Sequence, residues 1–226
     1  MRLEDRGKNL WATFTADMAR YGGGRRAWSP AFIRSLITEG YSHPGILAIV
    51  VYRFGQWVSY RCRIPIVRQI CELYYYYLFT WVRFTLQIEL PRSTAIDGGL
   101  RIDHFGGIII NSQAVAGKNF TITHGVLLGE TDTGVPVLGD NVSLGVGARV
   151  IGGITLGNYV QVGCGAVVTK SFSDGAVVAG VPAKLLRYKP VPELADSHVF
   201  GDSGPKGNAP EEAPSDDTES LRGAVA

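Results

Sequence analysis

Adjacent Asp103 and His104, followed by His124 twenty residues later, are the side chains of this chain best suited to proton transfer. An imidazole titrates near neutral pH, so it can take the proton of a hydroxyl group that attacks an acyl carbon. A neighbouring carboxylate can orient that base, and the oxyanion that forms needs a donor. For His124 three roles stay open (acceptor binding, donation to the oxyanion, or action as the base), beside a purely structural place at a corner.

The spacing around the first pair is irregular. Ile96 and Ile102 are six residues apart, but the next aliphatic residue in line, Ile110, follows after eight. Neighbours on a regular strand point to opposite faces, so Asp103 and His104 can pair only if the two extra residues bend the chain. We therefore predict a bulge that carries His104 as general base and Asp103 as its partner. The alternative is that His104 is a solvent-facing corner residue.

An internal repeat over residues 115–170 must position these side chains. An aliphatic residue recurs at every sixth place, usually followed by glycine, as at Leu138, Leu144, Val150, Leu156 and Val162. A period of six fits neither a helix nor an alternating strand. It indicates a chain that winds in flat-sided coils, with one short strand per side, a turn at each corner and three sides per coil. The predicted fold class is mainly β, a parallel β-helix.

Three motifs carry a resemblance to the hexapeptide-repeat acyltransferases, whose fold is a left-handed parallel β-helix: residues 102–110, 124–129 and 179–184. Within that family the chain is similar to the serine acetyltransferase-like branch, over roughly residues 94–187. The resemblance implies acetyl transfer within a ternary complex, without a covalent enzyme intermediate. It also implies that Asp103 and His104 match the family's catalytic pair, and that the chain forms a homotrimer. Whether trimers associate further stays open.

The loop at residues 130–136 departs from that branch. The serine acetyltransferases have Arg-His-Pro there, and the arginine holds the carboxylate of serine. Here the corresponding place reads Gly-Val-Pro. A carboxylate acceptor needs a bidentate cation, whereas Glu130 and Asp132 would repel it and could hydrogen-bond hydroxyl groups. The loop resembles those of exopolysaccharide-cluster O-acetyltransferases.

The predicted acceptor is therefore a hydroxyl of a sugar or polysaccharide precursor, bound by Asn111, Glu130 and Asp132. Two alternatives stay open. One is a serine O-acetyltransferase with a divergent acceptor loop. The other is a non-catalytic trimeric β-helix that serves as a scaffold, although a scaffold needs no bulged polar coil.

The resemblance implies acetyl-CoA as the donor, bound in the groove between subunits, and no metal. Its extended, amide-rich arm would pair with the backbone at Gly129, Val146 and Cys164. Lys184 and Arg187 would meet the CoA phosphates by charge. The alternative for both is a solvated basic residue, and Cys164 suits a small corner residue better than a nucleophile.

Composition divides the chain into a helical region (1–93), an acyltransferase β-helix (94–187) and a tail (188–226). The tail is rich in Pro, Gly, Ser and acidic residues, which predicts disorder. The net charge of +2 gives no reason to propose nucleic acid as a partner. Three widely spaced cysteines form neither a disulfide framework nor a zinc motif, and no signal-peptide pattern begins the chain. We expect a cytoplasmic protein.

Two apolar segments, 44–60 and 65–90, form most of the helical region. Arginines interrupt them too often for a membrane span, which needs about 20 mostly apolar residues. One interpretation is buried helices that pack on the β-helix or on neighbouring subunits. The other is a helical pair lying on the inner membrane surface, with arginines facing lipid phosphates and Tyr and Trp at the headgroups.

Overall fold

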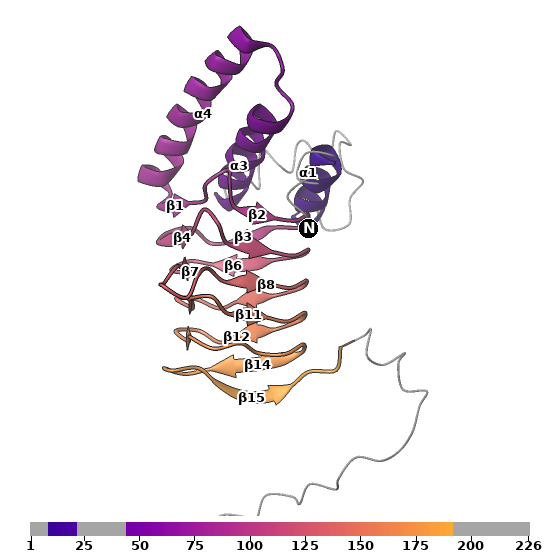
Figure 1. The fold of residues 1–226 in the computed structure, drawn as a ribbon, viewed down its shortest axis with the longest axis vertical. Helices are drawn as coiled ribbons and strands as arrows, with labels where there is room; N and C mark the ends of the chain where they lie inside the picture. Colours follow the sequence, from indigo (N-terminus) through magenta and orange to yellow (C-terminus); the bar gives the residue numbers. More distant parts are fainter. Residues whose placement is uncertain (1–8, 22–43, 192–226) are drawn as a thin grey trace, which may run out of the picture. The chain divides into compact units, whose positions relative to one another are not determined.

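The computed structural model describes residues 9–21 and 44–191; residues 1–8, 22–43 and 192–226 lie outside the description, including most of the predicted tail. Within the described ranges three helices precede the strands (Figure 1): α1 (Leu10–Ala19), α3 (Gly45–Tyr60) and α4 (Pro65–Thr85). The strands follow as a stack of short segments with the sequence order running down the stack. The description therefore covers a helical region joined to a β-solenoid.

Three parallel sheets form the sides of the solenoid. Sheet A contains β1 (Ile88–Glu89), β4 (Ile108–Ile110), β7 (Leu127–Gly129), β10 (Arg149–Ile151) and β13 (Val167–Val168). Sheet B contains β2 (Ala95–Ile96), β5 (Val115–Ala116), β8 (Val137–Leu138) and β11 (Thr155–Leu156). Sheet C contains β3 (Arg101–Asp103), β6 (Thr121–Thr123), β9 (Ser143–Leu144), β12 (Gln161–Val162), β14 (Ala176–Ala179) and β15 (Lys184–Tyr188).

The chain visits sheets A, B and C in turn, so parallel neighbours in a sheet belong to successive coils. In the regular coils partners are eighteen residues apart, as for Arg149 with Val167 and Ser143 with Gln161. The last pair, β14 with β15, is antiparallel. The solenoid has about five turns. The predicted fold class, a left-handed parallel β-helix after an N-terminal helical region, is confirmed.

The core is the stacked column of aliphatic residues that the six-residue repeat predicted. Each of the five parallel strands of sheet C has an almost completely buried aliphatic residue in this column: Ile102, Ile122, Leu144, Val162 and Val178. Strands in a sheet lie about 4.8 Å apart, so each side chain packs on the one in the next coil. Inward residues alternate with outward ones, as the buried middle residue of β3 and β6 shows.

Helix α3 packs against the first coil. Its first residue, Gly45, lies so close to Ile102 that any side chain there would overlap the strand. The hydroxyl of Tyr52 donates to the carbonyl of Thr94 at 2.7 Å and accepts from the amide of Ile96 at 3.2 Å. These contacts hold α3 on the strand β2 that begins sheet B.

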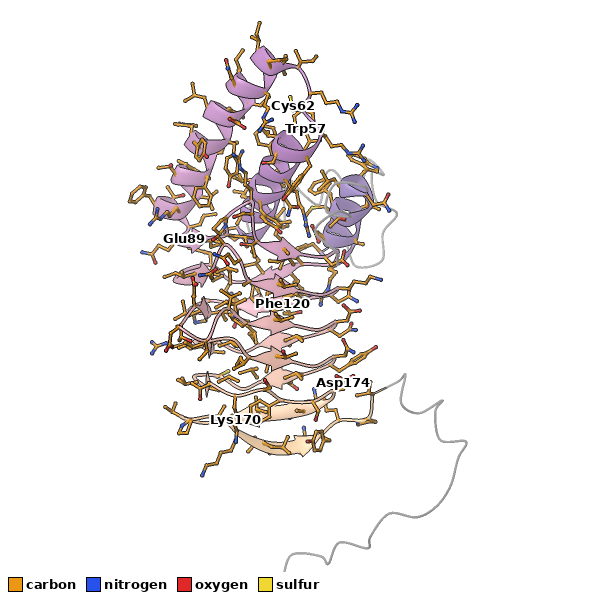
Figure 2. All side chains as sticks on the ribbon, viewed as in Figure 1. Trp57, Cys62, Glu89, Phe120, Lys170 and Asp174 are labelled. Atoms are coloured by element: carbon orange, nitrogen blue, oxygen red, sulfur yellow. The ribbon has the colours of Figure 1, made fainter. Side chains whose placement is uncertain are left out.

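Helix α4 begins at Pro65, which suits the first turn because proline lacks an N–H. It ends at Thr85, before the predicted end near residue 90, and β1 then pairs with β4 in sheet A. Its contact with the solenoid centres on Tyr75: the amide of Arg92 donates to its hydroxyl at 3.2 Å, and the guanidinium lies 4.9 Å from its ring centroid. Figure 2 shows Glu89 at this junction.

Candidate active site

The first coil of the solenoid contains two extra residues. Asp103 pairs with Thr123, twenty residues along the chain, whereas Ile109 pairs with Leu127, only eighteen along. The chain between β3 and β4 is therefore two residues longer than the chain between β6 and β7. This confirms the insertion that the aliphatic spacing predicted.

Hydrogen bonds at the corner identify the extra residues. The amide of Gly125 donates to the carbonyl of Gly106 at 2.8 Å, and one coil later the amide of Gly147 donates to the carbonyl of His124 at 2.9 Å. Gly106 therefore occupies in its coil the place that His124 occupies in the next. The two residues added to the corner are His104 and Phe105.

His104 has a left-handed backbone conformation, with φ of +67°. This region is uncommon for residues other than glycine, although histidine enters it more readily than most, and strain of this kind concentrates at functional sites. Both His104 and Phe105 are exposed to solvent. The insertion thus presents the imidazole outward from a rigid scaffold.

The two histidines lie together. The ring centroids of His104 and His124 are 6.0 Å apart, with the planes 80° from parallel. Both side chains are exposed, so one ligand at this corner can touch both imidazoles. The structure therefore brings together two of the three predicted catalytic residues in a geometry suited to proton transfer and oxyanion stabilisation.

Asp103, the third predicted catalytic residue, has a different partner. Its Oδ1 accepts a hydrogen bond from Nε of Arg101 at 2.7 Å. Residues two apart on a strand share one face, so β3 presents this pair together, and that spacing is the signal that could have revealed Arg101. The orientation of His104 by Asp103 stays a prediction.

Helix α1 ends beside the same strand, which sequence reasoning did not anticipate. The hydroxyl of Tyr21 accepts from the amide of Ile102 at 2.7 Å and lies 3.2 Å from its carbonyl. Burial raises the pKa of Tyr21 above its ordinary value. Arg20 donates to the carbonyl of Gly99 at 2.8 Å. These contacts hold the strand that leads to His104, and about 80 residues of intervening chain hide them from local patterns.

Below His124, the same corner continues through two of the predicted cofactor residues. Ser143 pairs with Thr121 and Gln161 with Ser143, so Val146 and Cys164 follow His124 at equivalent places in the next two coils. The amide of Gly165 donates to the carbonyl of Val146 at 2.7 Å, repeating the bond made by His124. We call His124, Val146 and Cys164 the corner column; all three are exposed.

The remaining predicted cofactor residues lie elsewhere. Lys184 lies on β15 and pairs with Ala179 of β14, so it is two strands below the coil of Cys164, and Arg187 is exposed on the same strand. Gly129 ends β7, at the far end of sheet A from His124. The column and Lys184 thus form a continuous edge, whereas Gly129 lies at the next corner.

The predicted acceptor residues cluster at that next corner. Nδ2 of Asn111 donates to Oε2 of Glu130 at 3.2 Å, and Asp132 is exposed in the loop that follows. His104 and His124 precede the sheet A strands β4 and β7, whereas Asn111 and Glu130 follow them. Within one chain the predicted acceptor residues and the histidines therefore lie at opposite ends of these strands.

A groove of about 650 Å³ lies away from both corners, between α1 and α3. Its walls are mostly apolar, and none of the predicted site residues lines it. The residues that line the groove are Asn9, Leu10, Trp11, Ala12, Phe14, Val50, Arg53, Phe54, Trp57 and Arg61.

The stacked corners of this solenoid define a hexapeptide-type β-helix with a histidine pair on its first coils. Known proteins share both fold and sequence. A serine acetyltransferase of Helicobacter pylori strain J99 is 34% identical over 148 residues, covering 64% of this chain and 82% of the relative. One from Synechococcus elongatus is 31% identical over 148 residues, covering 64% of this chain but 57% of the relative. No family model matches the chain.

Solved structures agree with the sequence comparison. The serine acetyltransferase of Brucella abortus strain S19 superposes with a TM-score of 0.62 at 25% identity, over 82% of this chain and 72% of that one. The same enzyme in complex with coenzyme A gives a TM-score of 0.63 at 25% identity, over 82% and 71%. The chain belongs to the serine acetyltransferase family.

Proposed function

We propose that this chain is an acetyl-CoA-dependent O-acetyltransferase that joins donor and acceptor in a ternary complex. The observation that carries the proposal is the two-residue insertion, which presents His104 beside His124 at the head of the corner column. A related structure that contains coenzyme A supports the donor. We also propose a cytoplasmic location; the three cysteines, all free, are compatible with it.

In the proposed reaction His104 takes the proton of the acceptor hydroxyl as its oxygen attacks the thioester carbonyl. His124 donates a hydrogen bond to the oxyanion that develops. Collapse of the tetrahedral intermediate breaks the carbon–sulfur bond, and the CoA thiolate takes the proton held by the imidazolium of His104. The products are the acetyl ester and free CoA, and the enzyme returns to its starting protonation state.

The proposed acceptor is L-serine, because the relatives reported above are serine acetyltransferases. A second acceptor class, a hydroxyl of a sugar or polysaccharide precursor, is favoured by one observation. The loop that follows β7 places the carboxylate of Glu130 in a hydrogen bond with Asn111, and residues 130–136 contain no lysine or arginine. Carboxylates of this kind bind hydroxyl groups and repel an acceptor carboxylate.

The separation of the two corners supports the homotrimer that the family resemblance implies. To touch His104 and Glu130 of one chain, an acceptor would have to extend along the strands of sheet A. In a trimer, the histidine corner of one copy would face the 130–136 loop of the next. CoA would then lie along the corner column, with Lys184 and Arg187 near its phosphates.

The test measures CoA release by the full chain with acetyl-CoA and either L-serine or a panel of monosaccharides, with mass spectrometry of the product. Saturable formation of O-acetylserine supports the main proposal. Acetylation of a sugar with no reaction on L-serine selects the second acceptor class. If no acceptor reacts and acetyl-CoA does not bind, the chain is a scaffold and the proposed function is wrong.

A further inference from the structure

Helix α4 carries an apolar face that no other described element covers. Six large apolar side chains recur every three or four residues along it, and we call them the outer stripe: Ile66, Ile70, Leu73, Tyr77, Trp81 and Phe84. Their exposed fractions range from 43% for Trp81 to 77% for Phe84. Because residues at this spacing share one side of an α-helix, the stripe is continuous over five turns, about 27 Å.

The other side of the helix accounts for its packing. Tyr75 and Val82 are the buried residues of α4, and both point away from the outer stripe at 100° per residue. The ring of Tyr74 meets Phe54 of α3 edge-on, with centroids 6.0 Å apart. Contact with α3 and the solenoid is therefore complete without the stripe. An exposed apolar surface of this extent marks an interaction site.

The charges around the stripe are mostly positive. Residues 61–85 contain four arginines and one glutamate, a net charge of +3. Arg61 and Arg63 are exposed in the connection before α4. Arg68 and Arg83 pair with Glu72 and Glu89 at 3.1 Å, but about half of each arginine side chain stays exposed. Exposed pairs of this kind are weak, so Arg83 can also face an external anion. Arg68 lies on the side of the helix that carries Tyr75, away from the stripe.

We propose that α4 docks on the surface of an anionic lipid bilayer, with the outer stripe in the headgroup region and Arg61, Arg63 and Arg83 at lipid phosphates. An apolar helix face with basic residues near its two ends is what such a surface binds. Tyr77 and Trp81 have the amphipathic rings that prefer the headgroup level. None of the described helices is long and apolar enough to cross a bilayer, so the helix lies along the surface.

Charge decides between a bilayer and a second copy of the chain as the occupant. Pairing two stripes would bring together two copies of residues 61–85, each with a net charge of +3 that includes Arg61 and Arg63 of the connection, and like charges repel. Anionic lipids instead attract that charge. Helices α3 and α4 are joined by a connection that contains Cys62, and Figure 2 shows this connection at the end of the two helices away from the solenoid. The coils leave the outer stripe exposed. This docking is independent of the acceptor.

The experiment is co-sedimentation of the full chain with vesicles of phosphatidylcholine alone, or of phosphatidylcholine with about one quarter phosphatidylglycerol. We expect binding to the anionic vesicles, weakening with added salt, and little binding to phosphatidylcholine alone. Leu73→Glu and Phe84→Glu should each lower the bound fraction at least tenfold. Val137→Glu is the matched control, because Val137 is also exposed (42%) but lies on the solenoid, and it should bind as wild type.

Circular dichroism and the melting temperature confirm that each variant folds, and Tyr77→Gln replaces any variant that does not. The proposal is wrong if the wild type stays with the vesicle-free fraction, or if the stripe variants bind as well as the control. Light scattering tests the rival occupant: if the stripe variants lower the oligomer mass and leave vesicle binding unchanged, the stripe joins copies of the chain. Acetyl transfer is measured in a separate assay, so failure of the bilayer proposal can be distinguished from failure of the proposed acetyltransferase function.

Discussion

Nε of Arg53 lies 2.7 Å from Oδ2 of Asp17, and both side chains are buried. Oδ1 of Asp17 also accepts from the amides of Gly99 and Leu100, each at 2.8 Å. Through this carboxylate, α1 is joined both to α3 and to the turn before β3. The first coil of the solenoid, which carries His104, is therefore held in place by Asp17 and Arg53, which lie far from it in the sequence.

Asp17→Asn should destabilise the fold by about 3–5 kcal/mol, because it leaves the guanidinium of Arg53 buried without its counter-charge. Urea denaturation measures this difference. Arg68→Gln is the control: its pair with Glu72 is exposed, with 51% and 29% of the side chains accessible, and should contribute less than about 1 kcal/mol. Equal effects of the two substitutions would show that the buried pair has no special role.

His104→Asn should lower kcat by about 10²- to 10⁴-fold, because it removes the proposed general base. Asparagine tolerates the left-handed backbone at φ of +67°, so the change should leave stability within about 0.5 kcal/mol. Steady-state CoA release measures kcat, and thermal unfolding checks the fold. His124→Asn should reduce the rate less than His104→Asn. A His104→Asn enzyme with wild-type kcat would remove the base from this position.

Val146→Trp should raise the KM for acetyl-CoA at least tenfold, about 1.4 kcal/mol of binding, by filling the corner column directly below His124. Val137→Trp makes the same change at a similarly exposed valine on sheet B and should leave that KM unchanged. Initial rates at varied acetyl-CoA concentration compare the two. If both variants keep the wild-type KM, CoA does not follow the column.

Tyr21→Phe should destabilise the fold by about 1 kcal/mol at neutral pH, because the hydroxyl makes hydrogen bonds with Ile102. The effect should depend on alkaline pH. Since burial raises the folded-state pKa of Tyr21, its stabilisation is complete below the unfolded value of about 10 and is lost as pH rises through the folded pKa.

Urea midpoints at neutral and alkaline pH test this dependence. Wild type should lose more stability than Tyr21→Phe as pH rises above about 10, so the gap between the two proteins should narrow. If the difference in stability between wild type and Tyr21→Phe does not change with pH, Tyr21 has the same pKa in the folded and unfolded states.

Glu130→Gln should lower the KM for L-serine about two- to fivefold if serine binds near this corner, since the substitution removes a like charge and keeps the length of the side chain. If the acceptor is a sugar, the same substitution should raise its KM, because a neutral amide is a weaker partner for hydroxyl groups. Asp174→Asn, at the last turn of the solenoid, is the control. A Glu130→Gln enzyme with unchanged KM for its acceptor would place the acceptor elsewhere.

The coil architecture and the insertion were predictable because both are local. A six-residue period states which residue of each side faces inward, and repetition implies the stacking of one coil on the next. The departure from that period between Ile102 and Ile110 therefore located the corner that carries His104. The same reasoning predicted that α4 begins at Pro65, but it did not predict that the helix ends at Thr85. The chain leaves the helix there because the next residues pair with β4 as strand β1, and that pairing is not visible in the local sequence.

The local pattern of residues was therefore enough to predict the β-helix, the position of its irregular coil and the side chains able to carry proton transfer. Which of these residues meet depended on how the chain packs. Packing brought the ring centroid of His104 to 6.0 Å from that of His124, gave Asp103 the partner Arg101, and paired Glu130 with Asn111 at the next corner. The reason is physical: periodicity fixes the direction of a side chain relative to its own coil, whereas contacts at a bulge or between distant helices depend on how the whole chain packs.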